Sequence, residues 1–174
     1  MSKSKDIVRN NKKLWAPWRM EYIKREISAK DKCVLCIDSS RDNDEENLIL
    51  FRGENAFVIM NLYPYNNGHL MVCPYSHIDS LKGLENTAYS EIMRLVIVCS
   101  NILQIAMNAE GFNFGANIGH SSGAGIEDHL HYHIVPRWSG DTNFMPVVGN
   151  TKVNVQGLQD TYDELVLYFN KMEN

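Results

Sequence analysis

The chain has 174 residues, of which 44% are hydrophobic and 22% charged, and its formal net charge is −4. This length and composition suit one soluble globular domain and exclude a low-complexity or fibrous chain. No uninterrupted apolar run approaches the roughly 20 residues that span a bilayer, and the basic N-terminus lacks the apolar core of a signal peptide. Four cysteines are too few for a dense disulfide scaffold. We therefore expect a cytoplasmic protein without a membrane partner.

Charge is distributed unevenly, with a basic N-terminus and an acidic remainder. Residues 1–32 carry ten Lys/Arg against four Asp/Glu, and residues 33–174 carry seven against seventeen. The basic charges alternate with large apolar side chains: Leu14, Trp15, Pro17, Trp18, Met20, Tyr22 and Ile23. Such side chains favour docking on the domain or on a second subunit over nucleic-acid binding. We predict a docking arm at 1–32 and a single domain at 33–174.

The predicted elements begin with three β-rich stretches, which follow a polar loop at 38–46 and are separated by turn residues. A long helical period comes next, then two more strands and a closing helix. The strands are expected at 48–51, 56–60, 69–73, 112–118 and 129–136, and the helices at 86–108 and 156–172. The inward faces of the helices are expected to carry Tyr89, Ile92, Val96, Cys99, Leu103 and Ala106, and Leu158, Tyr162, Leu165 and Phe169. This order predicts an α+β fold with an antiparallel five-stranded sheet, a long helix and a C-terminal helix.

A histidine stands at every second position in the last predicted strand, at His129, His131 and His133. Side chains two residues apart share one face of a strand, so three imidazoles would line one face while the intervening apolar residues enter the core. Packing does not require such a row, because a desolvated imidazole needs a polar partner. The spacing therefore predicts an active-site strand.

The run HLHYHIV at 129–135 resembles the motif of the histidine triad (HIT) family of nucleotide hydrolases and transferases. Its supporting segments recur in order: Asn61, NGHLMVCP at 67–74, SHI at 76–78, NIG at 117–119 and SSGAG at 121–125. The resemblance covers residues 33–145 and implies the HIT-like α+β fold and a homodimer. The segments at 14–20 and 136–144 are similar to the bacterial branch described as diadenosine tetraphosphate phosphorylases.

The histidines are the candidate catalytic residues. A neutral imidazole can act as a nucleophile near pH 7, and attack on the α-phosphorus of a nucleotide would split one displacement into two easier steps. His131 lies between two other histidines, and the resemblance implies that it is the nucleophile. His133 would donate a hydrogen bond to a phosphate oxygen or the leaving group, or would orient its neighbours. His129 completes the row.

Polar residues outside the row are candidate substrate contacts. The loop at 119–125 can offer backbone N–H groups and hydroxyls to an anion, through Ser121, Ser122, Gly123 and Gly125. The resemblance implies that Asn61 contacts the ribose. His69, Asn117 and Asn143 are further candidates, although His69 alone could equally be a core histidine. Arg137 could contact a polyphosphate or form a surface ion pair, and Trp138 is expected to pack.

A second predicted site binds metal. Cys33 and Cys36 have the spacing of a zinc half-site, which needs two further ligands to close a tetrahedron. Resemblance to metal-binding HIT branches and to the related galactose-1-phosphate uridylyltransferases implies that His77 and His129 complete a structural zinc site; iron is not distinguished from zinc. The alternative is a pair of unoccupied thiols. Cys73 and Cys99 are expected to be buried thiols.

These features predict an enzyme that transfers a nucleotidyl group through a covalent nucleotidyl-histidine. Dinucleoside polyphosphates are the expected substrates, cleaved by inorganic phosphate in a phosphorylase or by water in a hydrolase. The alternatives are a general nucleoside phosphoramidate or adenylyl hydrolase of the same family, and a non-catalytic nucleotide-binding protein. A binding protein would not need His131, so turnover by a His131→Ala variant separates these hypotheses.

Overall fold

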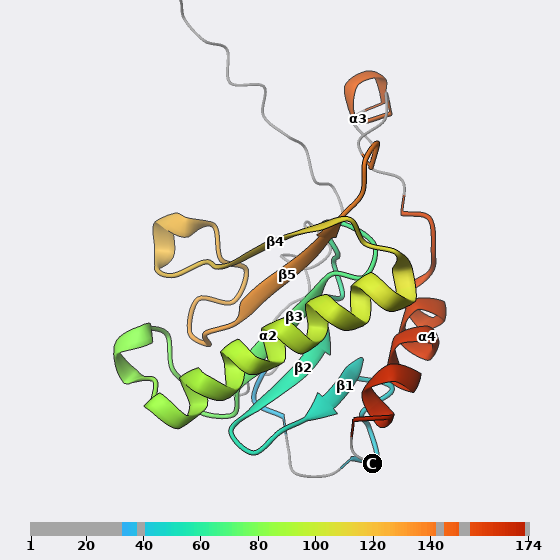
Figure 1. The fold of residues 1–174 in the computed structure, drawn as a ribbon. Coiled ribbons are helices and arrows are strands. Elements are labelled where there is room, and N and C mark those ends of the chain that lie inside the picture. Colours follow the sequence, from blue (N-terminus) through green and yellow to red (C-terminus); the bar gives the residue numbers. More distant parts are fainter. Residues whose placement is uncertain (1–32, 38–40, 142–144, 150–153, 173–174) are drawn as a thin grey trace, which may run out of the picture.

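The computed structural model describes residues 33–37, 41–141, 145–149 and 154–172. It is an α+β fold in which a five-stranded antiparallel sheet is crossed by a long helix (Figure 1). The predicted N-terminal arm at 1–32 and the candidate contact Asn143 lie outside the described residues.

All five predicted strands and both predicted helices are present, with ends within a few residues of the expected ones. The strands are β1 (Ile49–Arg52), β2 (Ala56–Met60), β3 (Leu70–Pro74), β4 (Gly111–Ala116) and β5 (Tyr132–Arg137). The helices are α2 (Asn86–Met107), the short α3 (Met145–Val148) and α4 (Leu158–Asn170), with 3-10 turns η1 (Leu81–Gly83) and η2 (His120–Ser122). The structure corrects one boundary, because β5 begins after the first two histidines of the row.

The sheet order is β1-β2-β3-β5-β4, and every neighbouring pair is antiparallel. The first three strands form a meander, after which β5 lies beside β3 and β4 takes the edge. In this register His133 of β5 lies opposite Met71 of β3 and Gly115 of β4. The last histidine of the row is therefore held by a strand on each side.

The two faces of the sheet have different partners. On one face, α2 packs on a core that includes Leu130, Tyr132 and Ile134, the apolar residues between and after the histidines. On the other face, a smaller cluster joins sheet residues such as Phe57 and Met71 to Leu35 of the segment 33–37. This segment therefore covers the face opposite α2.

The inward face of α2 differs from the prediction at one position. Tyr89 is 47% exposed, whereas Ala88 and Ile92 are buried. Residues 88, 92, 95 and 99 form a continuous stripe at helical spacing, and Tyr89 lies about 100° around the helix from Ala88. By length and composition alone, α2 is the one helix in the described residues that could cross a membrane, with a mean hydropathy of 1.4 over its most apolar window. Its apolar stripe is accounted for by packing on the sheet.

A buried carboxylate ties α2 to the turn between β1 and β2. Glu91 is 7% exposed and accepts hydrogen bonds from the backbone N–H of Glu54 (2.8 Å) and of Asn55 (2.7 Å), and from Asn55 Nδ2 (2.9 Å). A Cβ atom on Gly53 would collide with the Glu91 carboxylate. Hydrophobic periodicity gave no indication of this anchor, because it is a polar contact within an apolar stripe.

The last helix packs beside β1. Its predicted inward residues Tyr162, Leu165 and Phe169 are buried. The Tyr162 hydroxyl donates to the Ile49 carbonyl of β1 (3.2 Å), and the Phe169 ring lies 6.3 Å from that of Phe51. This helix covers β1 at one edge of the sheet, and β4 takes the other edge.

Candidate active site and metal centre

The three histidines of the row are buried on the face opposite α2. His129, His131 and His133 are 1%, 5% and 9% exposed, and the rings of His131 and His133 lie 4.8 Å apart in a T-shaped arrangement. The backbone leaves the sheet ladder before β5, because the Leu130 N–H donates to the Ile78 carbonyl (2.6 Å) instead of to a strand. The predicted alternation still holds, since Leu130 packs in the core on the α2 side.

The ring nitrogens of His131 are distinguished by one hydrogen bond. Nδ1 lies 2.7 Å from the backbone carbonyl oxygen of His129. A carbonyl only accepts, so Nδ1 carries the hydrogen and Nε2 carries the lone pair. Burial lowers the pKa of His131, and the bond to the His129 carbonyl opposes this in part. His131 is therefore a neutral imidazole with its lone pair on Nε2.

His133 has the complementary arrangement, which a chain of hydrogen bonds sets. The Tyr65 N–H donates to His69 Nδ1 (3.1 Å), so the hydrogen of His69 is on Nε2, which donates to His133 Nδ1 (2.9 Å). His133 then carries its own hydrogen on Nε2. Burial lowers the pKa of His133 to about 4, and repulsion from His131 adds to this effect when that ring is protonated.

His133 Nε2 is the one buried side-chain nitrogen or oxygen atom of the described residues that has no hydrogen-bond partner. Buried polar atoms are normally satisfied, and an orphaned one requires an explanation such as a bound ligand. A phosphate oxygen could accept from this N–H. The pair thus offers one lone pair, on His131, and one hydrogen-bond donor, on His133.

The predicted phosphate loop at 119–125 contains the turn η2. Gly119 and Gly123 have φ values of 82°, in the region that favours glycine. The Ser122 hydroxyl donates to the Gly119 carbonyl (2.7 Å), so it stabilises the loop, and Ser121 and Gly125 are exposed. The loop is accessible to a ligand, and its anion contacts remain a prediction.

The other polar candidates are placed by their contacts or by their position in the sheet. Asn61 Oδ1 accepts from the Tyr63 N–H (2.9 Å), and Asn117 is half-buried just after β4. Arg137 forms the surface ion pair that was one of its two predicted roles, at 2.6 Å from Asp141. Trp138 packs against the core as predicted, and its Nε1–H donates to the Met107 carbonyl.

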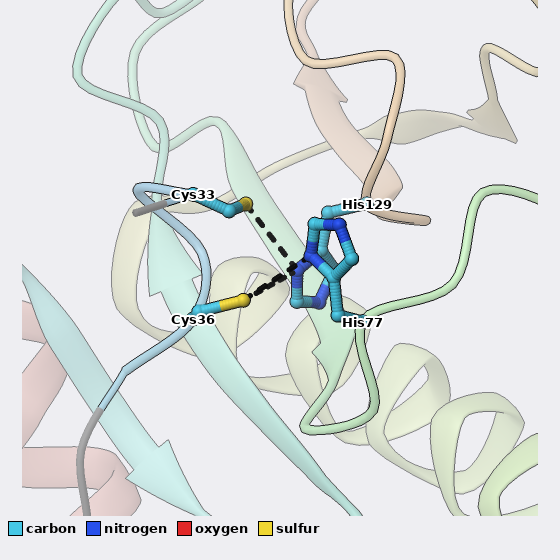
Figure 2. Close-up of side chains that lie close together, drawn as sticks. All are labelled: Cys33, Cys36, His77 and His129. Carbon is cyan, nitrogen blue, oxygen red and sulfur yellow. Dashed lines mark hydrogen bonds between the residues drawn. The ribbon is translucent and has the colours of Figure 1, made fainter. Parts of the chain in front are cut away.

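Four side chains from three segments form a compact group on the same side of the sheet (Figure 2). Cys33 and Cys36 come from the segment 33–37, His77 follows β3, and His129 precedes β5. Their ligand atoms all lie within 4.8 Å of one another. His129 Nδ1 is 3.5 Å from Cys33 Sγ and 3.6 Å from Cys36 Sγ, and His77 Nδ1 is 3.2 Å from Cys36 Sγ.

These separations fit a metal centre. In a tetrahedral zinc site with Zn–S and Zn–N bonds near 2.3 and 2.1 Å, neighbouring ligand atoms are about 3.6 Å apart. The Nε2–H of His129 donates to the Pro74 carbonyl (2.9 Å), which leaves the Nδ1 lone pair towards the sulfur atoms. Metal-binding histidines commonly donate their second ring N–H in this way. The predicted group of four is therefore brought together, with donors that suit zinc.

Two further features of the site were not predicted from the sequence. The Tyr65 ring lies against His69 and His133, with centroids 4.6 and 5.6 Å apart, and the Pro74 carbonyl orients His129. Two surface hollows, of about 640 and 480 Å³, are lined by none of the triad histidines. Histidine chemistry, and not the size of a hollow, identifies the site.

The HIT domain family matches residues 42–140, which is more than half of the chain. The chain belongs to the HIT family. Over 155 residues it is 38% identical to a Mycobacterium tuberculosis protein named AP-4-A phosphorylase, and the alignment covers 86% of this chain and 80% of that protein.

Solved HIT structures share the fold. A zinc-bound histidine triad family protein from Mycobacterium smegmatis is similar with a TM-score of 0.63 and 18% identity, over 82% of this chain and 96% of that one. A hypothetical histidine triad nucleotide-binding protein from Sulfolobus tokodaii gives a TM-score of 0.62 at 23% identity, over 81% and 94%. The predicted HIT-like α+β fold is confirmed.

Proposed function

We propose that this HIT protein cleaves dinucleoside polyphosphates by transferring a nucleotidyl group through His131. The observation that carries the proposal is the complementary protonation of two neighbouring imidazoles. His131 has a lone pair on Nε2, and His133 has a buried N–H without a hydrogen-bond partner. The 38% identity to the protein named AP-4-A phosphorylase supports this substrate class. The non-catalytic alternative does not account for the lone pair of His131.

The proposed reaction has two displacement steps. His131 Nε2 attacks the α-phosphorus, so that a P–N bond forms and the P–O bond to the remaining polyphosphate breaks. The Nδ1–H of His131 bonds to the His129 carbonyl, which stabilises the positive charge that the ring gains. His133 donates its Nε2–H to a phosphoryl oxygen or to the departing oxygen. An acceptor oxygen then attacks phosphorus and releases His131.

Substrate contacts are assigned by position around this pair. We propose that the loop at 119–125 binds phosphate through Ser121, Ser122, Gly123 and Gly125, supported by its exposure and its two glycines at positive φ. Asn61 is proposed at the ribose and Asn117 as a further polar contact. His69 acts through His133, to which it donates. Asn143, outside the described residues, keeps its proposed role as a polar contact.

Zinc is the proposed metal, held by Cys33, Cys36, His77 and His129. Two sulfur and two nitrogen donors in a compact group suit zinc, and the zinc-bound M. smegmatis relative supports it. With four protein ligands the site is closed, so the metal would be structural. Its effect would reach the chemistry through His129, whose side chain it would fix and whose carbonyl orients His131.

A homodimer is the proposed assembly, as the family resemblance implies. In the described residues β4 pairs with β5 on one side only, and an unpaired strand edge favours association. Large apolar side chains are exposed on β4 and on α2, with Phe114 at 48% and Ile105 at 68%. Light scattering should give a molar mass twice that of the chain, and Phe114→Asp should lower it to the mass of a monomer. A monomeric wild-type protein would contradict the proposed dimer.

The arm at 1–32 is proposed to dock on the domain or on the partner subunit, and the protein to act in the cytoplasm. The arm's excess of six positive charges complements the excess of ten negative charges in residues 33–174. Its tryptophans favour a packed location over solvent.

The function is tested by incubating the protein with diadenosine tetraphosphate, with and without inorganic phosphate. We expect ATP and ADP, with ADP formed only when phosphate is present, which makes the enzyme a phosphorylase. ATP and AMP in water alone would make it a hydrolase. Cleavage of an adenosine phosphoramidate alone would favour the family alternative. Tight binding without turnover would contradict the proposal.

A further inference from the structure

Tyr65 lies between the His69–His133 pair and the solvent. It belongs to the loop that joins β2 to β3, and its ring is stacked on that of His133 at an interplanar angle of 28°. Tyr65 is 46% exposed, whereas His69 is 1% and His133 is 9% exposed. One surface of the tyrosine therefore faces the buried histidines and the other faces outward.

The main chain of Tyr65 also acts on this pair. Its N–H donates to His69 Nδ1 at 3.1 Å, and an N–H can be accepted only by a ring nitrogen without hydrogen. This bond requires the hydrogen of His69 to be on Nε2, from which it is donated to His133 Nδ1. The protonation pattern of His133 thus depends on a backbone group two hydrogen bonds away.

The loop that carries Tyr65 is held by contacts that do not use its ring. The Asn61 N–H donates to the His69 carbonyl (2.9 Å), and the His69 N–H donates to the Asn66 carbonyl (3.2 Å). Gly68 has a φ of 70°, and a Cβ atom there would lie 2.7 Å from Met107 Sδ, so glycine lets the loop pack closely on α2. A change of the Tyr65 side chain should therefore leave the loop in place.

We propose that Tyr65 is a positioning residue of the active site, whose ring excludes water from the His69–His133 pair and whose N–H fixes the hydrogen of His133 on Nε2. The inference rests on the proposed role of His133 as a donor to the substrate. Tyr65 need not touch the reacting atoms, because it acts through the two histidines.

Loss of the ring has a definite chemical consequence. His133 faces His69, His131 and Tyr65, and burial is the main cause of its lowered pKa. Water in place of the ring would stabilise the charged form and raise this pKa. A protonated His133 carries hydrogen on both nitrogens and can no longer accept from His69 Nε2–H, so the pair would have to rearrange.

The test compares Tyr65→Leu, which removes the ring and keeps the N–H, with Tyr65→Phe, which removes only the hydroxyl. Tyr89→Leu is the control, since Tyr89 is equally exposed, at 47%, but lies on α2 across the sheet. For Tyr65→Leu we expect kcat to fall about tenfold, while KM changes less than about threefold. In the profile of kcat against pH, the midpoint of the acidic limb should move up by about one pH unit. Tyr65→Phe and Tyr89→Leu should resemble the wild type.

Nitrogen NMR of histidine-labelled protein gives a readout independent of turnover. In the wild type His69 and His133 should both carry hydrogen on Nε2, and in Tyr65→Leu the His133 pKa should rise. The proposal would be overturned if the wild-type histidines had the opposite tautomers. It would also be overturned if Tyr65→Leu left both kcat and the His133 pKa unchanged, or raised only KM. A His131→Ala variant that still turns over would instead overturn the proposed function, and the wild-type spectrum would still test Tyr65.

Discussion

The histidines of the row have different chemical roles because their ring nitrogens have different partners. His129 turns one nitrogen to the cysteine sulfurs and the other to a carbonyl. His131 uses one nitrogen to donate to the His129 carbonyl, which leaves a lone pair on the other. His133 accepts from His69 and so presents an N–H. The proposed metal ligand, nucleophile and donor follow from these partners.

The buried state of His133 predicts a pH dependence of stability. Its pKa is about 4 when folded against an ordinary 6.5, so the unfolded chain binds its proton at higher pH. The contribution of the neutral, buried His133 to the free energy of unfolding is complete above about pH 6.5 and is lost as the pH falls towards 4. Between pH 7 and pH 4.5, the free energy of urea unfolding should fall about 2 kcal/mol more for the wild type than for His133→Gln. Equal losses would contradict the burial of this imidazole.

The spacing of the histidines was sufficient to predict which residues gather, but not their protonation. Alternation placed the three rings on one face and the spacing of Cys33 and Cys36 indicated half of a metal site, whereas His77 and His129 were added only by the family resemblance. The tautomers depend on the Pro74 carbonyl and the Tyr65 N–H, whose positions come from the sheet register and the β2–β3 loop. Tyr65 lies in the stretch YPYNNG at 63–68, whose composition is that of a turn between two strands, so nothing in the sequence singled it out.

At the scale of elements, hydrophobic periods predicted the strands and helices well because most of them bury one face. They failed where polar contacts decide the structure. The start of β5 moved because Leu130 bonds to the Ile78 carbonyl, and the inward face of α2 includes Glu91, which no apolar pattern can indicate. Tyr89 was wrongly placed inward because it lies beside the apolar stripe.

The Glu91 anchor predicts a large effect from one polar residue. Glu91→Ala would leave the N–H groups of Glu54 and Asn55 without their acceptor, and should lower the free energy of unfolding by about 2–3 kcal/mol. Arg94→Ala is the control, since Arg94 is exposed and 3.7 Å from Glu91, and should cost less than about 1 kcal/mol. Urea unfolding measures both, and similar small losses would show that Glu91 is no anchor.

At the scale of the whole molecule, the proposed metal centre joins segments far apart in the sequence. Three segments meet there: residues 33–37 contribute Cys33, the turn after β3 contributes His77, and the start of the triad contributes His129. The same residue, His129, supplies the carbonyl that accepts a hydrogen bond from His131, the proposed nucleophile. In this proposal the metal centre and the catalytic histidine meet at one residue, on the face of the sheet opposite α2.

Loss of the proposed zinc should lower the stability of the fold. Purified protein should contain about one zinc per chain, and Cys36→Ser should reduce this content and lower the thermal midpoint by several degrees. Val34→Ser is the control, because Val34 lies between the two cysteines and is 68% exposed. Metal analysis and thermal unfolding measure both variants. The proposed zinc site would be contradicted if the wild-type protein bound no zinc from solution, or if a chelator left its thermal midpoint unchanged.

We propose that a bond forms between phosphorus and His131 during turnover. The direct measurement is to mix the enzyme with a dinucleoside polyphosphate labelled at the α-phosphorus, denature it in alkali within one turnover and sequence the labelled peptide by mass spectrometry. We predict label on His131 that inorganic phosphate removes, and no label on a His131→Ala variant whose kcat is at least about a hundredfold lower. An unlabelled enzyme, together with a His131→Ala variant of undiminished kcat, would contradict a covalent intermediate on His131.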